Sequence, residues 1–205
     1  MNKFIIGLAF LVVLSSCTKE KITDPATAKD YSIFLTQTAQ TFQGKFNGSA
    51  FYWFFGYSQF QSTAGFYNGN GVCDSTDPER ILVFGLTSED DLETRFLIST
   101  PKYNSSVDQE LEKIFTPGKK KLGNLYTDFH LTVTKDKKDY KTSATDTNNE
   151  IEVLKTEPFT DYLGKKLRVW FRLSGKLSSC NCQNSTINLT DGVILAEFFG
   201  YKKTI

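Results

Sequence analysis

The sequence predicts an all-β domain, an antiparallel β-sandwich with one short helix, and a closed lipocalin-like β-barrel is the alternative. Three observations predict this class. Apolar and polar residues alternate in several segments, dipeptides typical of tight turns separate those segments, and aromatic residues are abundant, with 18 Phe and 9 Tyr in 205 residues. Only one segment has helical spacing, which disfavours an alternating βαβ architecture.

Alternation with a period of two identifies the strands. In residues 128–134 the odd positions are apolar and the even positions polar, so His130 falls on the polar, solvent-facing side. In residues 167–173 the odd positions are again apolar, which leaves Arg168, Trp170 and Arg172 together on the outward face. The other expected strands cover residues 51–60, 81–87, 95–100, 151–155 and 193–199.

Turn and cap residues delimit these elements. Four dipeptides that tolerate positive φ predict hairpin turns: Asn47-Gly48, Asn68-Gly69, Asn70-Gly71 and Asp191-Gly192. The single helix is expected to begin at Ser106, with Gln109 completing a capping box, and to end before Pro117.

The N-terminus has the features of an export signal. Lys3 precedes an apolar run over residues 4–14, which is too short to cross a bilayer permanently but suits a signal peptide. The junction Leu14-Ser15-Ser16-Cys17 resembles the lipobox of bacterial lipoproteins. That resemblance implies cleavage between Ser16 and Cys17 and acylation of Cys17, whose several acyl chains would anchor the protein in a membrane.

The resemblance also sets the expected location and domain boundaries. Thr18 stands where an Asp retains some lipoproteins at the inner membrane, so the outer membrane is the expected destination. Residues 1–16 form the signal peptide, residues 17–30 the lipidated end and a flexible tether, and residues 31–205 one β-rich domain. A tether of this length reaches on the order of 20 Å.

Charge argues against nucleic acid as a partner. Removing residues 1–16 takes one lysine, Lys3, from the 24 basic residues and none of the 23 acidic residues, so the mature chain is formally neutral. A neutral chain lacks the basic field that neutralises phosphates. The expected partners are the membrane, through the lipid, and an envelope ligand or protein that the sequence leaves undefined.

Three cysteines remain besides Cys17. Thiols outside the cytoplasm tend to be oxidised, so a disulfide from Cys73 to either Cys180 or Cys182 is expected, with one thiol left over. A metal site is disfavoured, because the C-x-C pair lacks a second ligand pair and His130 is the only histidine. No metal and no cofactor is therefore expected.

Candidate binding residues are few, and catalytic motifs are missing. Arg168, Trp170 and Arg172 are the candidate binding stripe, because guanidinium groups stack on an indole, although a solvated face is the simpler interpretation. The aromatic run 51–57 is expected to be mainly core rather than a sugar platform. The chain contains no G-x-S-x-G, P-loop or H-E-x-x-H motif. The sequence thus favours a lipid-anchored, non-catalytic envelope protein; a surface glycan hydrolase with carboxylates from separate strands is the alternative.

Overall fold

The computed structural model describes residues 31–55, 60–68, 78–88, 94–106, 110–162, 164–179 and 185–199. The expected signal peptide, Cys17 and the tether lie outside these residues, as do Cys73, Cys180 and Cys182. The described residues are dominated by strands. The elements are η1 (Phe34–Thr36), β1 (Thr41–Phe46), β2 (Ser49–Phe54), β3 (Phe60–Asn68), β4 (Glu79–Ser88), β5 (Arg95–Ser99), β6 (Tyr103–Asn104), α1 (Glu110–Ile114), β7 (Gly118–Lys121), β8 (His130–Lys135), β9 (Lys138–Lys141), β10 (Glu150–Asp161), β11 (Gly164–Ser179) and β12 (Thr186–Phe199).

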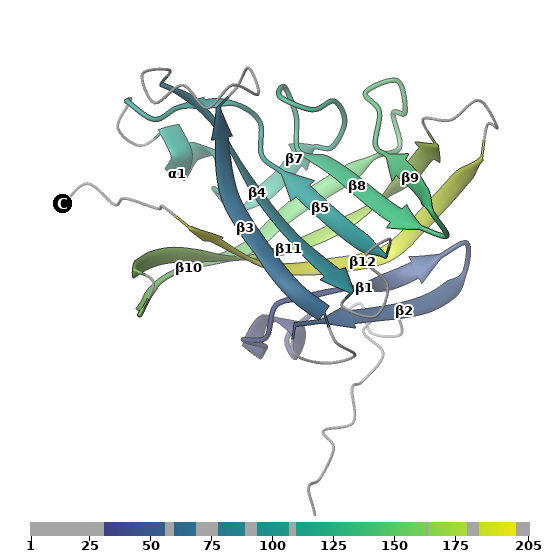
Figure 1. Ribbon diagram of the computed structural model, residues 1–205, viewed down its shortest axis with the longest axis horizontal. Coiled ribbons are helices and arrows are strands. Elements are labelled where there is room, and N and C mark those ends of the chain that lie inside the picture. The colour runs from purple at the N-terminus through teal and green to yellow at the C-terminus, as the bar shows by residue number, and fades with distance from the viewer. Residues whose placement is uncertain are drawn as a thin grey trace, which may run out of the picture.

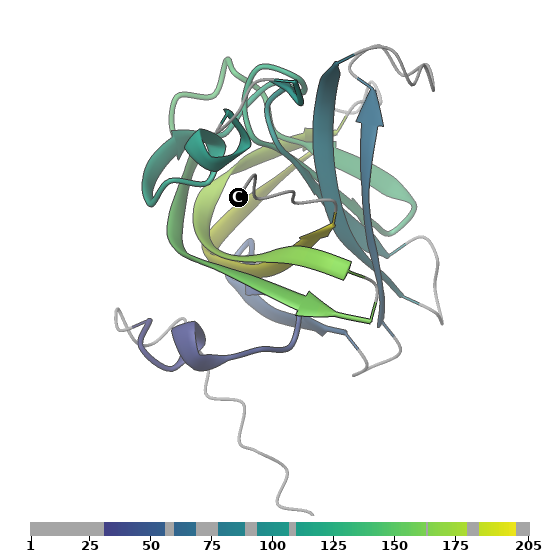
Figure 2. The same cartoon turned by 90° about the vertical axis from the view of Figure 1, so that its left-hand side faces the viewer.

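One strongly curved antiparallel sheet contains all of these strands. Its main path runs β2-β1-β12-β11-β9-β8-β5-β4-β3, while β10 pairs with β11 and β7, and β6 pairs with β4. The two halves curl toward each other, so that β3 and β4 face β12 across the core (Figures 1 and 2). No pairing among the described strands joins β3 to β2, so the sheet stays open. The expected all-β antiparallel sandwich is confirmed, and the barrel alternative is not.

The core fills the concave side of the sheet. Alternate residues of β1, β4, β5, β8, β11 and β12 point inward and are fully buried, as the period-two pattern predicts. Aromatic rings contact one another within this core: the ring centroid of Phe42 lies 4.3 Å from that of Phe96 and 5.5 Å from that of Trp53. The aromatic run contributes as expected, because Phe51 and Trp53 pack into this core.

The hairpin predicted at Asp191-Gly192 is wrong. β12 continues through these residues from Thr186 to Phe199. Asp191 has a φ of 52°, and the pairing shifts register opposite it, between Gln43 and Lys45 on β1 and between Leu173 and Gly175 on β11. The dipeptide therefore forms a β-bulge, which uses the same positive φ as a tight turn. By contrast, the Asn47-Gly48 hairpin between β1 and β2 is confirmed.

The described residues contain the C-terminal part of the predicted helix. α1 covers Glu110–Ile114 and ends before Pro117 as expected, while the predicted start at Ser106 leads into residues outside the described part. Phe115 follows α1 and packs onto Phe198, with ring centroids 5.0 Å apart. Among the described residues, neither helix combines the length and the apolar character that crossing a bilayer requires.

Candidate functional site on the outer face of the sheet

Arg168, Trp170 and Arg172 do share the outward face of β11. Antiparallel pairing places Glu197, Leu195 and Val193 of β12 beside them, in that order. On the other side, β10 places Glu157 beside Arg168 and Glu152 beside Arg172. The predicted stripe is therefore the centre of a layer of side chains from three strands.

This stripe is covered by the chain's own N-terminal segment. We call residues 31–40 the strap. Phe34 of η1 packs with Trp170, Val193 and Leu195 in a second, outer core, and Trp170 is only 1% exposed. Tyr31, Phe34 and Leu35 have the spacing that places side chains on one face of a helical turn, which explains why they pack together here.

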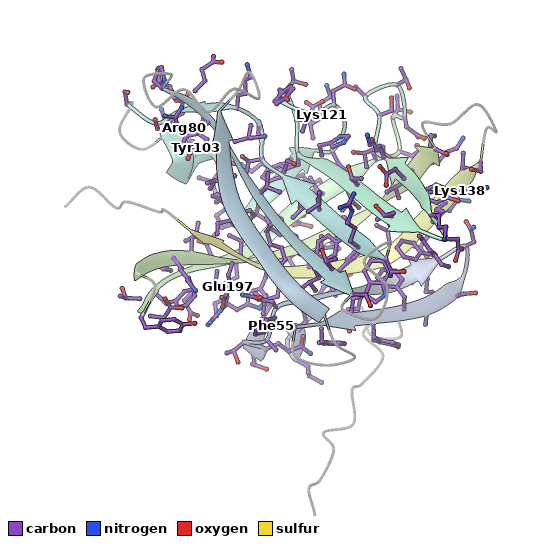
Figure 3. All side chains as sticks on the ribbon, in the orientation of Figure 1. Phe55, Arg80, Tyr103, Lys121, Lys138 and Glu197 are labelled. Atoms are coloured by element: carbon purple, nitrogen blue, oxygen red, sulfur yellow. The ribbon has the colours of Figure 1, made fainter. Side chains whose placement is uncertain are left out.

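Three contacts fix the direction of the strap. The Tyr31 ring lies 5.6 Å from the Arg172 guanidinium, the Trp170 indole N–H donates to the Phe34 carbonyl at 3.2 Å, and the Gln40 amide donates to Glu197 at 2.6 Å. The strap thus runs antiparallel to β11, from Arg172 toward Arg168. Figure 1 shows η1 outside the curved sheet, and Figure 3 shows Glu197 projecting from β12 toward the same side.

Arg168 belongs to a mostly buried network of hydrogen bonds and ion pairs at the Gln40 end of the strap. Its Nε and Nη2 donate to the same Glu197 oxygen at 3.1 and 2.9 Å, and its Nη1 lies 3.5 Å from Glu157. Its guanidinium also lies 4.3 Å from the centre of the Phe159 ring. Because these partners use its donors and cover its face, Arg168 serves to hold the fold together.

Trp170 does not stack on an arginine as the sequence suggested. The cation over its ring is Lys155 of β10, whose Nζ lies 4.3 Å from the ring centroid. The backbone brings them together, since Lys155 pairs with Trp170 after a register shift in β10. The arginines face the rings of Phe159 and Tyr31 instead.

Arg172, at the other end of the strap, lines an open pocket. The pocket has a volume of about 160 Å³ and is lined by Tyr31, Glu150, Glu152, Arg172, Leu173, Ser174 and Asp191. Arg172 forms an ion pair with Glu152, and its side chain keeps 42% of its area exposed, compared with 14% for Arg168. This pocket combines one cation, three carboxylates, a hydroxyl group and an aromatic wall, and it is our candidate functional site.

Cations next to the pocket set its electrostatics. Lys119 pairs with Glu150, and its hydrogen bond and charge lower the pKa of that carboxyl group. Lys45 lies 3.3 Å from Asp191. Desolvation disfavours the charge on Arg172, but its contacts with Glu152 and Tyr31 outweigh this effect and raise its pKa. Each carboxylate of the pocket therefore has its own cation.

Glu150 is poorly suited to act as a general acid. A general acid that protonates a glycosidic oxygen needs a raised pKa, and that of Glu150 moves in the opposite direction. Within the described part of the chain, no group of three His, Cys, Asp or Glu residues is placed to hold a metal ion.

His130 is buried, so the expectation of a solvated histidine is wrong. The residue is 8% exposed, and its Nδ1 lies 2.7 Å from the Gly123 carbonyl oxygen. A carbonyl only accepts, so Nδ1 carries the proton of the neutral ring. Burial lowers the pKa of His130, and the nearby charge of Lys141 lowers it further, against the opposing effect of the Gly123 hydrogen bond. The period of the strand gave the correct face, but it could not reveal that the loop containing Gly123 covers that face.

No protein-family model, curated protein or solved structure matches this chain.

Proposed function

We propose that this protein is a lipid-anchored component of the bacterial outer membrane whose β domain binds a ligand or partner in the cell envelope without catalysis. The lipobox-like residues Leu14-Ser15-Ser16-Cys17 support the anchor. The pocket around Arg172, in which each carboxylate is paired with a cation, supports a binding role.

The observation that carries the proposal is the attachment of the strap. Residue 31 is where the expected tether ends, and from there the strap packs onto the outer face through Phe34, which is 2% exposed. A tether joined to a loose end would leave the domain's orientation free. Here the first described residue, Tyr31, lines the pocket, so the point where the expected tether joins the domain is next to the pocket.

Metabolic labelling with a palmitate analogue, followed by membrane fractionation, tests the anchor. The wild-type protein should incorporate label and sediment with outer membranes. Cys17→Ala should lose the label, whereas Cys73→Ala, which removes a cysteine elsewhere in the chain, should keep it. A wild-type protein that is unlabelled and soluble would refute the anchor.

A further inference from the structure

The pocket beside Arg172 has a composition that indicates its ligand, and this inference rests on the proposed binding role. Its walls come from four parts of the chain: the strap, β10, β11 and the bulge in β12. Tyr31 supplies the aromatic wall, and Ser174 supplies a hydroxyl group on the strand that carries Arg172. A concave site with one apolar wall and several convergent polar groups is the usual form of a small-molecule site.

The charges around the pocket are balanced, which favours a neutral ligand over an ionic one. Glu150, Glu152 and Asp191 are matched by Lys119, Arg172 and Lys45. A cation entering the pocket would have to compete with these three partners, and an anion would face three carboxylates. A neutral ligand avoids both costs, and it still finds acceptors on the carboxylates and donors on Arg172.

The geometry points to a sugar. We propose that the pocket binds one neutral sugar ring, such as a terminal residue of an envelope glycan. Sugar hydroxyls both donate and accept, so they can bond to carboxylates and to a guanidinium group in the same site. The less polar face of the ring would lie on Tyr31, whose ring offers apolar area. A volume of about 160 Å³ suits one ring rather than an enclosed oligosaccharide.

Titration of the full-length protein, purified in detergent, with single sugars tests this proposal. The probes are the neutral methyl glycosides of glucose, galactose, mannose and N-acetylglucosamine, with glucuronate and glucosamine as the anionic and cationic counterparts. At least one neutral glycoside should bind with a Kd on the order of 1 mM, as expected for a small ligand in an open site. Both charged sugars should bind more weakly.

Variants of the pocket distinguish specific binding at this site from nonspecific binding elsewhere on the protein. Tyr31→Ala should weaken binding about tenfold or more, whereas Tyr31→Phe should stay within about threefold, because it keeps the ring and the strap contact. The matched control is Tyr162→Ala, which removes a tyrosine that is 93% exposed outside the pocket and should change nothing. Glu152→Gln leaves one cation in excess, so it should shift the preference toward glucuronate.

Three results would overturn the proposal: no neutral glycoside binds, a charged sugar binds best to the wild type, or Tyr31→Ala behaves like Tyr162→Ala. The assay reads the pocket whether or not Cys17 carries lipid. A failed sugar site therefore shows in this titration alone, whereas a failed anchor shows in the palmitate labelling alone.

Discussion

Arg168 and Arg172 occupy the same face of the same strand, yet their surroundings differ. Arg168 is 14% exposed and shares Glu197, itself 10% exposed, with Gln40. Arg172 is 42% exposed and forms its ion pair at the edge of an open pocket. The strap runs along the stripe from Arg172 to Arg168. At the Arg168 end, the hydrogen-bonded network beneath the strap excludes most solvent.

This difference shows that residue type and strand position do not decide the role of a charged side chain. A buried charge with several partners is costly to leave unpaired, while an exposed pair contributes little to stability. We therefore expect Arg168 to matter for folding and Arg172 to matter for binding. The following predictions test this division, from the largest effect to the smallest.

Replacing Arg168 should have the largest effect. Arg168→Met leaves Glu197 without its cation in a nearly buried position, so the free energy of unfolding should fall by about 4 kcal/mol. Urea denaturation measures this change. The double variant Arg168→Met/Glu197→Leu removes both charges and should recover much of the loss. A drop below about 1 kcal/mol for Arg168→Met would mean that the network is effectively solvated.

Detaching the strap should have the second-largest effect on stability. Phe34→Ala removes the ring that fills the outer core and should lower the free energy of unfolding by about 3 kcal/mol. The Trp170 indole N–H, which donates to the Phe34 carbonyl, should then exchange with solvent faster, as NMR can measure. Ile33→Ala, at a neighbouring residue that is 61% exposed, is the matched control and should change stability by less than about 0.5 kcal/mol. Equal effects of the two substitutions would argue against a packed strap.

Much of the fold could be predicted, because alternation records which face of a strand is buried. The inward residues of β8 and β11 and the Asn47-Gly48 turn follow directly from local sequence. The hairpin prediction at Asp191-Gly192 was wrong because a β-bulge and a hairpin turn both need a residue with positive φ. Distinguishing them requires knowing that β12 has partners on both sides, which local sequence does not contain.

The site was only half predictable for a related reason. The outward stripe of Arg168, Trp170 and Arg172 was found, but not what covers it. Tyr31, Phe34 and Leu35 carry a recognisable helical spacing, although one turn is too short for that spacing to stand out. The pocket depends on Glu150 and Glu152 of β10 meeting Asp191 of β12 across β11, and their approach is set by register shifts that no motif encodes.

His130 offers the same comparison on another strand, because a loop covers it much as the strap covers Trp170. Burial lowers its pKa in the folded protein, so the unfolded chain binds a proton more readily. The stabilisation is therefore complete above the unfolded pKa of about 6.5 and declines as the pH falls toward the folded pKa. Urea unfolding from pH 8 to pH 5 should show the wild type losing its advantage over His130→Asn below about pH 6.5. A constant difference between the two proteins would indicate a solvated ring.

Arg172 should have the smallest effect on stability. Arg172→Met removes a partly exposed ion pair with Glu152, and such pairs contribute at most about 1 kcal/mol. A double-mutant cycle with Glu152→Gln should give a coupling energy of about 0.5 kcal/mol in urea denaturation. This coupling energy should also decrease in high salt, because solvent and ions reach this pair. A coupling as large as that of Arg168 with Glu197 would show that the two ends of the strap are energetically alike, and the assignment of one end to folding and the other to binding would fail.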